Sequence, residues 1–211
     1  IKKMERGALL VLEGCDRVGK STQVKRLVKV LNDSGIKAEA RGFPNRKTTI
    51  GKLIDEFLTS KKDLAPEAVH LLFSANRWEC SNDLIKTLNS GVTLVVDRYA
   101  ASGAAYSATS TNKGLSWCKE PDRGLPAPDL VALITADEET IMSREGWANE
   151  RFERQEFQRK VTDNFLKLKD DTWKIVSGNQ SIDEIHSELL QEALKIINQV
   201  KNSPIKLLYE S

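Results

Sequence analysis

Short apolar segments alternate with longer amphipathic segments along most of the chain, which is the pattern of an α/β protein. Four of the short segments are rich in apolar residues and are bounded by helix breakers, so they are predicted to be buried strands. They are Leu9–Leu12, Thr93–Val96, Leu130–Ile134 and Trp173–Val176. Lys37–Arg41 is a weaker candidate for a fifth strand. Because helical segments separate these strands, we expect a parallel sheet with helices on both faces.

Three long helices are predicted between or after the strands. Apolar residues recur at helical spacing from Val24 to Leu31, in a helix that ends near Asn32–Gly35. A second helix covers Pro66–Asn89, and a third carries one apolar stripe along Ile182–Val200. The segment Glu138–Arg159 is polar, rich in charge and poor in β-branched residues, as expected of a mobile helical lid.

Composition narrows the class of protein. The 211 residues contain neither repeats nor a low-complexity linker, so a single domain spanning residues 1–211 is expected. Lys and Arg number 32 against 30 Asp and Glu, a net charge of +2, which argues against a nucleic-acid partner. The longest apolar runs hold five residues, far short of the ~20 that cross a bilayer, so no membrane partner is expected. Three scattered cysteines and the absence of a secretory pattern predict a reduced, cytoplasmic protein, with nucleus and mitochondrion as open alternatives.

The segment Gly14–Thr22 carries the clearest chemical signal. It fits the pattern GxxxxGK[ST] in full, follows a predicted strand and leads into a predicted helix, the context in which this pattern forms a phosphate-binding loop. Its glycines let backbone N–H groups surround phosphate oxygens, and the helix N-terminus adds positive charge. Lys20 is predicted to reach the β- and γ-phosphates of ATP, and the Ser21 hydroxyl to complete the coordination of Mg²⁺. A chance match in a loop is the alternative, and it leaves the flanking strand and helix unexplained.

Further candidates lie at the carboxyl end of a strand and on the second helix. Asp97 and Arg98 follow a predicted strand, where ligands of α/β sheets collect, and fit a metal-positioning carboxylate and a phosphate clamp. The alternative is that these two residues form a structural salt bridge with no part in binding or catalysis. Phe73 and Arg77 share one helix face at i, i+4 and could grip a planar base, although spacing alone favours a core Phe and a solvated Arg. Arg46 fits a phosphate ligand and a surface arginine equally well.

Five motifs follow one another along the chain. They are Leu12-Glu13-Gly14-x-Asp16-Arg17-x-Gly19-Lys20-Ser21-Thr22-Gln23, Arg41-Gly42-Phe43-Pro44, Leu71-Leu72-Phe73-Ser74-Ala75-Asn76-Arg77-Trp78, Asp97-Arg98-Tyr99 with Ser102-Gly103, and Pro126-Ala127-Pro128-Asp129-Leu130. Together they closely resemble thymidylate kinases of the eukaryotic type, from about Gly7 to Val200. The resemblance implies a three-layer P-loop NTPase fold with a small helical lid. It also implies Mg²⁺-dependent transfer of the γ-phosphate of ATP to dTMP, giving dTDP and ADP for dTTP synthesis, by a homodimer.

The resemblance also implies roles for single residues. Phe73 would stack on thymine, Arg77 would hydrogen-bond a thymine carbonyl, and Tyr106 would lie against C2′ of the sugar. Asp16 would take the sugar 3′-hydroxyl, and Arg17 would reach across the ATP phosphates. The expected catalytic residues are Asp16, Arg17, Lys20 and Arg98.

The remaining expected ligands fall into three groups. The ATP site would consist of Gly14, Arg17, Val18, Gly19, Lys20, Ser21, Thr22, Gln180 and, near the adenine, Arg144. The dTMP site would consist of Asp16, Phe43, Phe73, Arg77, Ser102, Gly103, Tyr106 and, on the acceptor phosphate, Arg46 and Arg98. The metal would be held by Ser21 and Asp97.

The lid, residues 138–159, departs from the family pattern at two positions. Phe152 stands where the pattern often has a tyrosine, so any hydrogen bond made by that hydroxyl is lost. Arg154 adds a positive charge where the pattern often has a small residue, close to Arg151. Arginines on a lid over phosphates are expected, and the alternative is that they are solvated. Some enzymes of the family carry an extra arginine in the lid, and others carry it in the phosphate loop. Because this chain has both Arg154 and Arg17, it does not fall clearly into either type.

Three alternative functions would place different demands on the sequence. A deoxynucleoside kinase on the same fold would need no arginines for an acceptor phosphate, so Arg46 and Arg98 argue against it. A GTPase-like switch would need an Asn-Lys-x-Asp segment, but the Asn-Lys pair at 112–113 is followed by Gly-Leu. A nucleotide-binding homologue without activity would not be expected to keep an intact phosphate loop together with Asp97.

Overall fold

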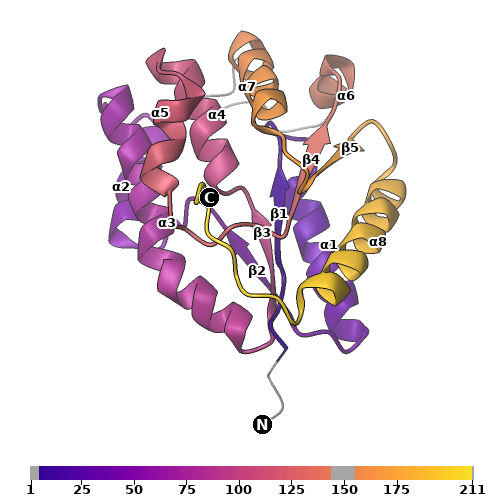
Figure 1. Cartoon of the computed structure of the whole chain (residues 1–211). Helices are drawn as coiled ribbons and strands as arrows, with labels where there is room; N and C mark the ends of the chain where they lie inside the picture. The colour runs from indigo at the N-terminus through magenta and orange to yellow at the C-terminus, as the bar shows by residue number, and fades with distance from the viewer. Residues whose placement is uncertain (1–4, 144–154, 211) are drawn as a thin grey trace.

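The computed structural model describes residues 5–143 and 155–210. Five strands form one sheet in the order β2-β3-β1-β4-β5, and every neighbouring pair is parallel (Figure 1). The strands are β1 (Leu9–Glu13), β2 (Ala38–Gly42), β3 (Thr93–Asp97), β4 (Leu130–Thr135) and β5 (Trp173–Ser177). Leu12 of β1 lies opposite Asp97 of β3, so the loops that follow these two strands leave the same edge of the sheet side by side.

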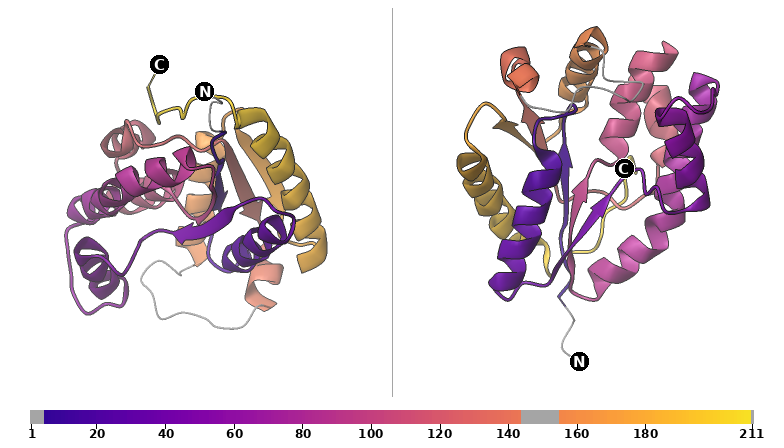
Figure 2. Two further views of the ribbon diagram at one scale, coloured as in Figure 1. Left: turned by 90° about the horizontal axis from the view of Figure 1, so that it is seen from below. Right: turned by 180° about the vertical axis from the view of Figure 1, so that it is seen from behind.

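Helices cover both faces of the sheet, as Figures 1 and 2 show. On one side lie α1 (Lys20–Asp33) and α8 (Ile182–Val200), which pack against each other. On the other side lie α2 (Thr49–Leu58), α3 (Pro66–Asn89) and α5 (Leu115–Lys119), the last of which continues into the 3₁₀ turn η1 (Glu120–Asp122). Beyond the carboxyl edge, α4 (Ala100–Thr111) packs against α7 (Gln155–Leu168), and α6 (Glu138–Ser143) follows β4.

Strand β1 is buried on both faces, which is why it reads as an unbroken apolar run. Leu10 and Leu12 pack in one core cluster with α1, whereas Leu9 and Val11 pack in a second cluster with α3. A strand with two apolar faces is held in the centre of the sheet. The phosphate-binding loop that follows it is therefore anchored in the most buried part of the fold.

The strand and helix predictions are confirmed at most positions. All five strands occur within one residue of the expected boundaries, and the second and third helices have the predicted ends. The sequence did not predict α2, α4 or α5. The expected lid contains α6 and the start of α7, which continues past the predicted boundary to Leu168, and residues 144–154 lie outside the described part of the chain.

Candidate active site

The phosphate-binding loop joins β1 to α1 and has the backbone geometry that its glycines allow. Gly14 has φ 135° and Gly19 has φ 96°, both in the region that side chains disfavour. A Cβ atom on Gly14 would also lie 2.3 Å from the carbonyl oxygen of Ile134. Helix α1 begins directly after Gly19, so the N–H groups of its first turn are directed toward the loop. The loop thus offers a concave anion site.

Lys20 lies at the base of this loop and is buried. Its ammonium group donates a hydrogen bond to the carbonyl oxygen of Cys15 at 2.5 Å. Burial, together with the charge of Arg98, lowers the pKa of Lys20 to about 8. An anionic phosphate placed in the loop would reverse this effect by favouring the charged ammonium.

A hydroxyl and a carboxylate meet beside Lys20. The Ser21 hydroxyl donates to Oδ2 of Asp97, which stands at the end of β3. Hard divalent cations favour oxygen ligands of this kind. Within residues 5–143 and 155–210, no group of three or more His, Cys, Asp or Glu side chains could hold a metal ion. A cation at this pair would therefore complete its coordination with phosphate oxygens and water.

Arg98 connects the loop to the far half of the pocket. Its Nη2 forms an ion pair with Oδ1 of Asp16 at 2.5 Å, and its Nη1 donates to the Gly14 carbonyl at 3.0 Å and to the Ser102 hydroxyl at 3.2 Å. Burial by itself raises the pKa of Asp16, but the charges of Arg98 and Lys20 outweigh it and hold that pKa below its usual value. Asp16 is therefore a carboxylate at neutral pH.

The second oxygen of Asp16 binds two more side chains. The Tyr106 hydroxyl donates to Oδ2 at 3.2 Å, and the side-chain amide of Gln158 donates to it at 3.1 Å. Tyr106 comes from α4 and Gln158 from α7. Because the Arg98 guanidinium also lies 5.2 Å from the Tyr106 ring centroid, four side chains from four segments form one network.

A buried carboxylate holds the start of α4. Oε1 of Glu13 accepts hydrogen bonds from the backbone N–H groups of Tyr99 at 2.9 Å and Ser102 at 3.0 Å, and Oε2 accepts from the Ser102 hydroxyl at 2.5 Å. Burial raises the pKa of Glu13, although these hydrogen bonds oppose that shift. Glu13 thereby caps α4 from β1 and fixes the helix that carries Tyr106.

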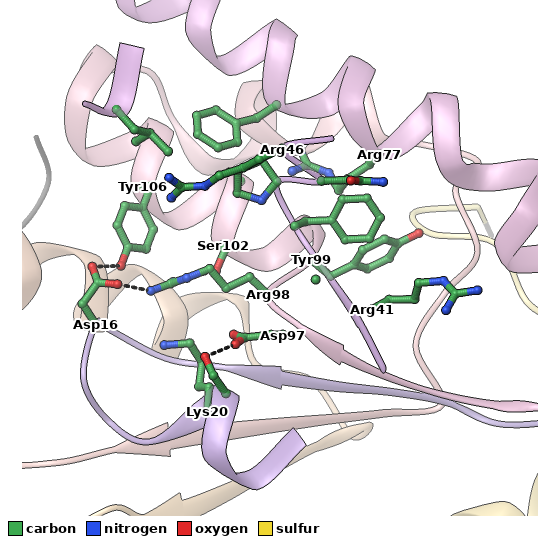
Figure 3. Close-up of a pocket in the computed structure, with 18 of the residues that line it drawn as sticks. Asp16, Lys20, Arg41, Arg46, Arg77, Asp97, Arg98, Tyr99, Ser102 and Tyr106 are labelled. Atoms are coloured by element: carbon green, nitrogen blue, oxygen red, sulfur yellow. Dashed lines mark hydrogen bonds and ion pairs between the residues drawn. The ribbon is translucent and has the colours of Figure 1, made fainter. Parts of the chain in front are cut away.

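Asp16, Lys20, Ser21, Asp97, Arg98 and Tyr106 line one pocket of about 970 Å³, which extends from the phosphate-binding loop to α3 (Figure 3). At its far end Phe73 and Arg77 both line the pocket, which agrees with the shared helix face that their i, i+4 spacing predicted. The alternative of a solvated arginine is wrong, because Arg77 is only 1 % exposed and pairs with Asp122. Arg46 also lines the pocket, and its guanidinium pairs with Asp55 of α2 at 2.6 Å.

The structure gathers most of the predicted ligands around this pocket. Those that line it are Asp16, Arg17, Gly19, Lys20, Ser21, Thr22, Phe43, Arg46, Phe73, Arg77, Asp97, Arg98, Ser102, Gly103 and Tyr106. Gly14 and Val18 belong to the loop but do not line the pocket: the Gly14 carbonyl accepts from Arg98, and Val18 is buried. Gln180 is exposed in the connection from β5 to α8 and does not line it either. The lid residues Arg144, Arg151, Phe152 and Arg154 lie outside the described residues.

Several residues of the site were not assigned roles from the sequence. Glu13 and Arg41 belong to two of the five motifs that resemble the family, so their place in these motifs could have identified them as site residues. Tyr99 also lies in a motif; its buried ring packs against Phe43 with 5.5 Å between the centroids. Gln158 carries no local signal, because its contact with Asp16 spans 142 positions of sequence.

The phosphate-binding loop follows the central strand of a parallel sheet, a carboxylate ends the neighbouring strand, and arginines surround the adjoining pocket. These features define the class of P-loop phosphotransferases. Comparison with known proteins narrows this class. The chain belongs to the thymidylate kinase family, whose model, described as "Thymidylate kinase", matches residues 12–189.

Individual relatives agree with this family over nearly the whole chain. The thymidylate kinase of Danio rerio is 42% identical over 207 residues, covering 97% of this chain and 98% of the relative. That of Homo sapiens is 43% identical over 208 residues, with 97% and 98% covered. Among solved structures, a thymidylate kinase from Candida albicans superposes with a TM-score of 0.87 at 38% identity, covering 96% of this chain and 98% of that one.

Proposed function

We propose that this chain transfers the γ-phosphate of ATP to dTMP, giving dTDP and ADP. The observation that carries the proposal is the Asp16–Arg98 ion pair, which joins the phosphate-binding loop to the aromatic and arginine-lined end of the same pocket. A donor nucleotide in the loop and an acceptor nucleotide at the far end would meet beside Arg98. Family membership supports the choice of substrates.

The donor side needs positive charge more than a base. The phosphate of the acceptor is already nucleophilic, so positioning and charge neutralisation are the main demands. Lys20 and the N–H groups of the loop would hold the β- and γ-phosphates, and Arg17, which lines the pocket, would reach across them. Thr22 would add a ligand from α1, Gln180 would belong to the ATP site, and Arg144 would lie near the adenine, as the resemblance implies.

Ser21 and Asp97 fit a magnesium ion. Both supply oxygen, they are in contact, and they stand next to the place proposed for the phosphates. Bound there, Mg²⁺ would neutralise negative charge on the β- and γ-phosphates. The chain's own part is to hold Asp97 at the end of β3 and Ser21 on the first turn of α1.

The acceptor side would orient dTMP. Phe73 would stack on the base, Arg77 would donate to a base carbonyl, and Tyr106 would lie against C2′ of the sugar. Asp16, held as a carboxylate, would accept from the 3′-hydroxyl. Arg98 would hold the acceptor phosphate together with Arg46; Phe43, Ser102 and Gly103 would complete the walls.

We further propose that residues 1–211 act as one catalytic domain, with residues 138–159 as its lid, in a cytoplasmic homodimer. Leu71 and Trp78 of α3 are 51% and 42% exposed and lie seven positions apart on one helix face, which supports an apolar contact between two copies of the chain at this face. Light scattering of wild type and Leu71→Glu tests the dimer.

Within the described residues, no helix combines the length and hydropathy of a membrane span.

A coupled ADP-release assay across nucleoside monophosphates, with thymidine included, tests the function. We expect dTMP to be the best acceptor. A preference for thymidine would support a deoxynucleoside kinase, and ATP or GTP hydrolysis without any acceptor dependence would support a switch protein. Binding of ATP without turnover of any acceptor would support an inactive homologue.

A further inference from the structure

We infer that Asp122 is a positioning residue for dTMP, which fixes the guanidinium of Arg77 in the orientation that presents it to the base. The inference rests on the proposed function, since it concerns the acceptor end of the same pocket. Asp122 belongs to η1, and the site residues predicted from the sequence did not include it. It lies behind Arg77 and does not line the pocket.

The contact between Asp122 and Arg77 is a fully buried fork. Nε of Arg77 donates to Oδ1 at 3.0 Å and Nη2 donates to Oδ2 at 2.7 Å, with side-chain exposures of 2% and 0%. Two parallel charge-assisted hydrogen bonds fix the plane of the guanidinium as well as its position. Breaking a buried pair on one side leaves an uncompensated charge, so this geometry is strongly preferred.

The carboxylate of Asp122 is itself fixed. The Ser74 hydroxyl, one turn before Arg77 on α3, lies 2.8 Å from Oδ1 and 2.9 Å from the carbonyl oxygen of Pro121. The residues that follow η1 pair with the C-terminal segment: Gly124 N donates to Leu208 O at 3.0 Å, and Leu208 N donates to Leu125 O at 2.7 Å. In Figure 1 this segment runs from α8 across to the side of the sheet covered by α3.

Helix α4 limits the guanidinium on its other side. A Cβ atom at Gly103 would lie 2.5 Å from Nη2 and 3.0 Å from Nη1 of Arg77, so the backbone of α4 approaches it as closely as a glycine permits. Asp122 occupies the Nε–Nη2 edge of the guanidinium. The Nη1 end is therefore the part that can serve a ligand in the pocket that Arg77 lines.

The pairing also sets the chemical class of ligand. The charge of Asp122 offsets that of Arg77 at close range, so the pair presents N–H donors with little net charge. Such donors suit the neutral carbonyl oxygen of a base more than a phosphate. Arg98 is also paired with an aspartate, Asp16, but it lies beside Lys20 and the phosphate-binding loop, whose positive charge makes that end of the pocket the better place for an anion.

Asparagine at position 122 would keep the volume of the side chain but could not accept both hydrogen bonds from the Arg77 guanidinium. Its amide offers one acceptor, and its NH₂ group would face an N–H of Arg77. The guanidinium would then have to turn away from its present plane. We therefore expect Asp122→Asn to raise the KM for dTMP by ~10- to 100-fold, the range for losing a hydrogen bond to a charged group. The kcat at saturating dTMP and the KM for ATP are expected to stay within ~3-fold of wild type.

The chain offers a matched control. Arg6 and Asp129 form a second, largely buried fork before the first residues of β1 and β4, with both contacts at 2.8 Å and side-chain exposures of 7% and 12%. Asp129→Asn should lower the melting temperature as Asp122→Asn does, and it should leave the KM for dTMP unchanged. A purely structural role for Asp122 predicts that the two variants behave alike.

The experiment compares wild type, Asp122→Asn and Asp129→Asn for kcat, both KM values and melting temperature. An equal KM for dTMP in the two variants, with wild type active on dTMP, would overturn the role of Asp122 alone. If wild type does not phosphorylate dTMP at all, the result contradicts the proposed function itself, not only the role of Asp122. Should Asp122→Asn not fold, Ser74→Ala decides: it removes one hydrogen bond to Oδ1 and is expected to raise the KM for dTMP by ~3- to 10-fold. An unchanged KM in that variant would also overturn the inference.

Discussion

Asp16 of the phosphate-binding loop and Arg98 at the end of β3 form an ion pair, with 2.5 Å between Oδ1 and Nη2, across two neighbouring strands of the sheet. The pair ties the residue proposed for the acceptor sugar to the residue proposed for the acceptor phosphate. It also places both within the network that includes Tyr106 and Gln158. A substitution of either residue should therefore affect the binding and turnover of the acceptor nucleotide more than the binding of ATP.

Asp16→Asn tests this relationship. The variant keeps an acceptor oxygen but removes the charge that holds Arg98, so kcat/KM for dTMP is expected to fall by ~10- to 100-fold. The KM for ATP should change little. The exposed pair Arg26–Asp183 has the same 2.5 Å separation, and because exposed pairs contribute little, Asp183→Asn is the matched control and should be neutral. Equal losses with ATP and dTMP would show that Asp16 serves the phosphate loop as a whole.

The pKa of Lys20 predicts how ATP binding depends on pH. Burial and the charge of Arg98 lower this pKa to about 8 in the free chain, and the bound phosphates should return it toward its usual value. Above pH 8 the free chain carries fewer protons than the complex, so binding takes up a proton. The affinity for ATP is then expected to fall as pH rises above 8, by at most ~10-fold per unit.

Calorimetry in two buffers of different ionisation enthalpy measures that proton directly. Lys20→Arg is the control, because its guanidinium stays charged throughout this range and should remove the dependence. Proton release on binding, or the same pH profile in both proteins, would contradict the assignment of the titration to Lys20.

The strands and the phosphate-binding loop were predictable because their signals are local. Burial on both faces of β1 produces an apolar run, and the loop pattern needs only its neighbours in sequence. Helix α4 was missed because it is rich in Ala, Ser, Gly and Thr and has no strong apolar stripe. The partner of Arg77 could not be predicted, since Asp122 is 45 positions away in a loop without periodicity.

Phe73→Ala tests base stacking. If the ring stacks on thymine, the affinity for dTMP should weaken by ~1–3 kcal/mol, the range for base–aromatic stacking, and the affinity for ATP should barely change. Leu72 is the matched control: it packs against the same small core cluster as Phe73 but does not line the pocket. Leu72→Ala should leave both affinities unchanged. If the two variants lose dTMP affinity equally, Phe73 is a core residue only.

Tyr106 is expected to set the preference for the deoxy sugar. Its ring packs 6.0 Å from Phe157 and 6.5 Å from Phe165, centroid to centroid, so it is held in place from the side of α7. Tyr106→Ala should raise activity on the ribonucleotide relative to dTMP, because a 2′-hydroxyl would no longer meet the ring. Tyr106→Phe keeps the ring and should keep the selectivity. A ratio that does not change in the alanine variant would remove Tyr106 from sugar recognition.

Phosphoryl transfer itself is tested most directly by following the γ-phosphate. Wild type is incubated with ATP labelled at the γ-position and with dTMP or thymidine, and the labelled products are separated. We expect label in dTDP at a rate that depends on dTMP, no label in dTMP when thymidine is the acceptor, and loss of transfer in Lys20→Ala with the fold retained. Label that appears only as inorganic phosphate, or that passes to thymidine, would contradict the assignment of this pocket to dTMP phosphorylation.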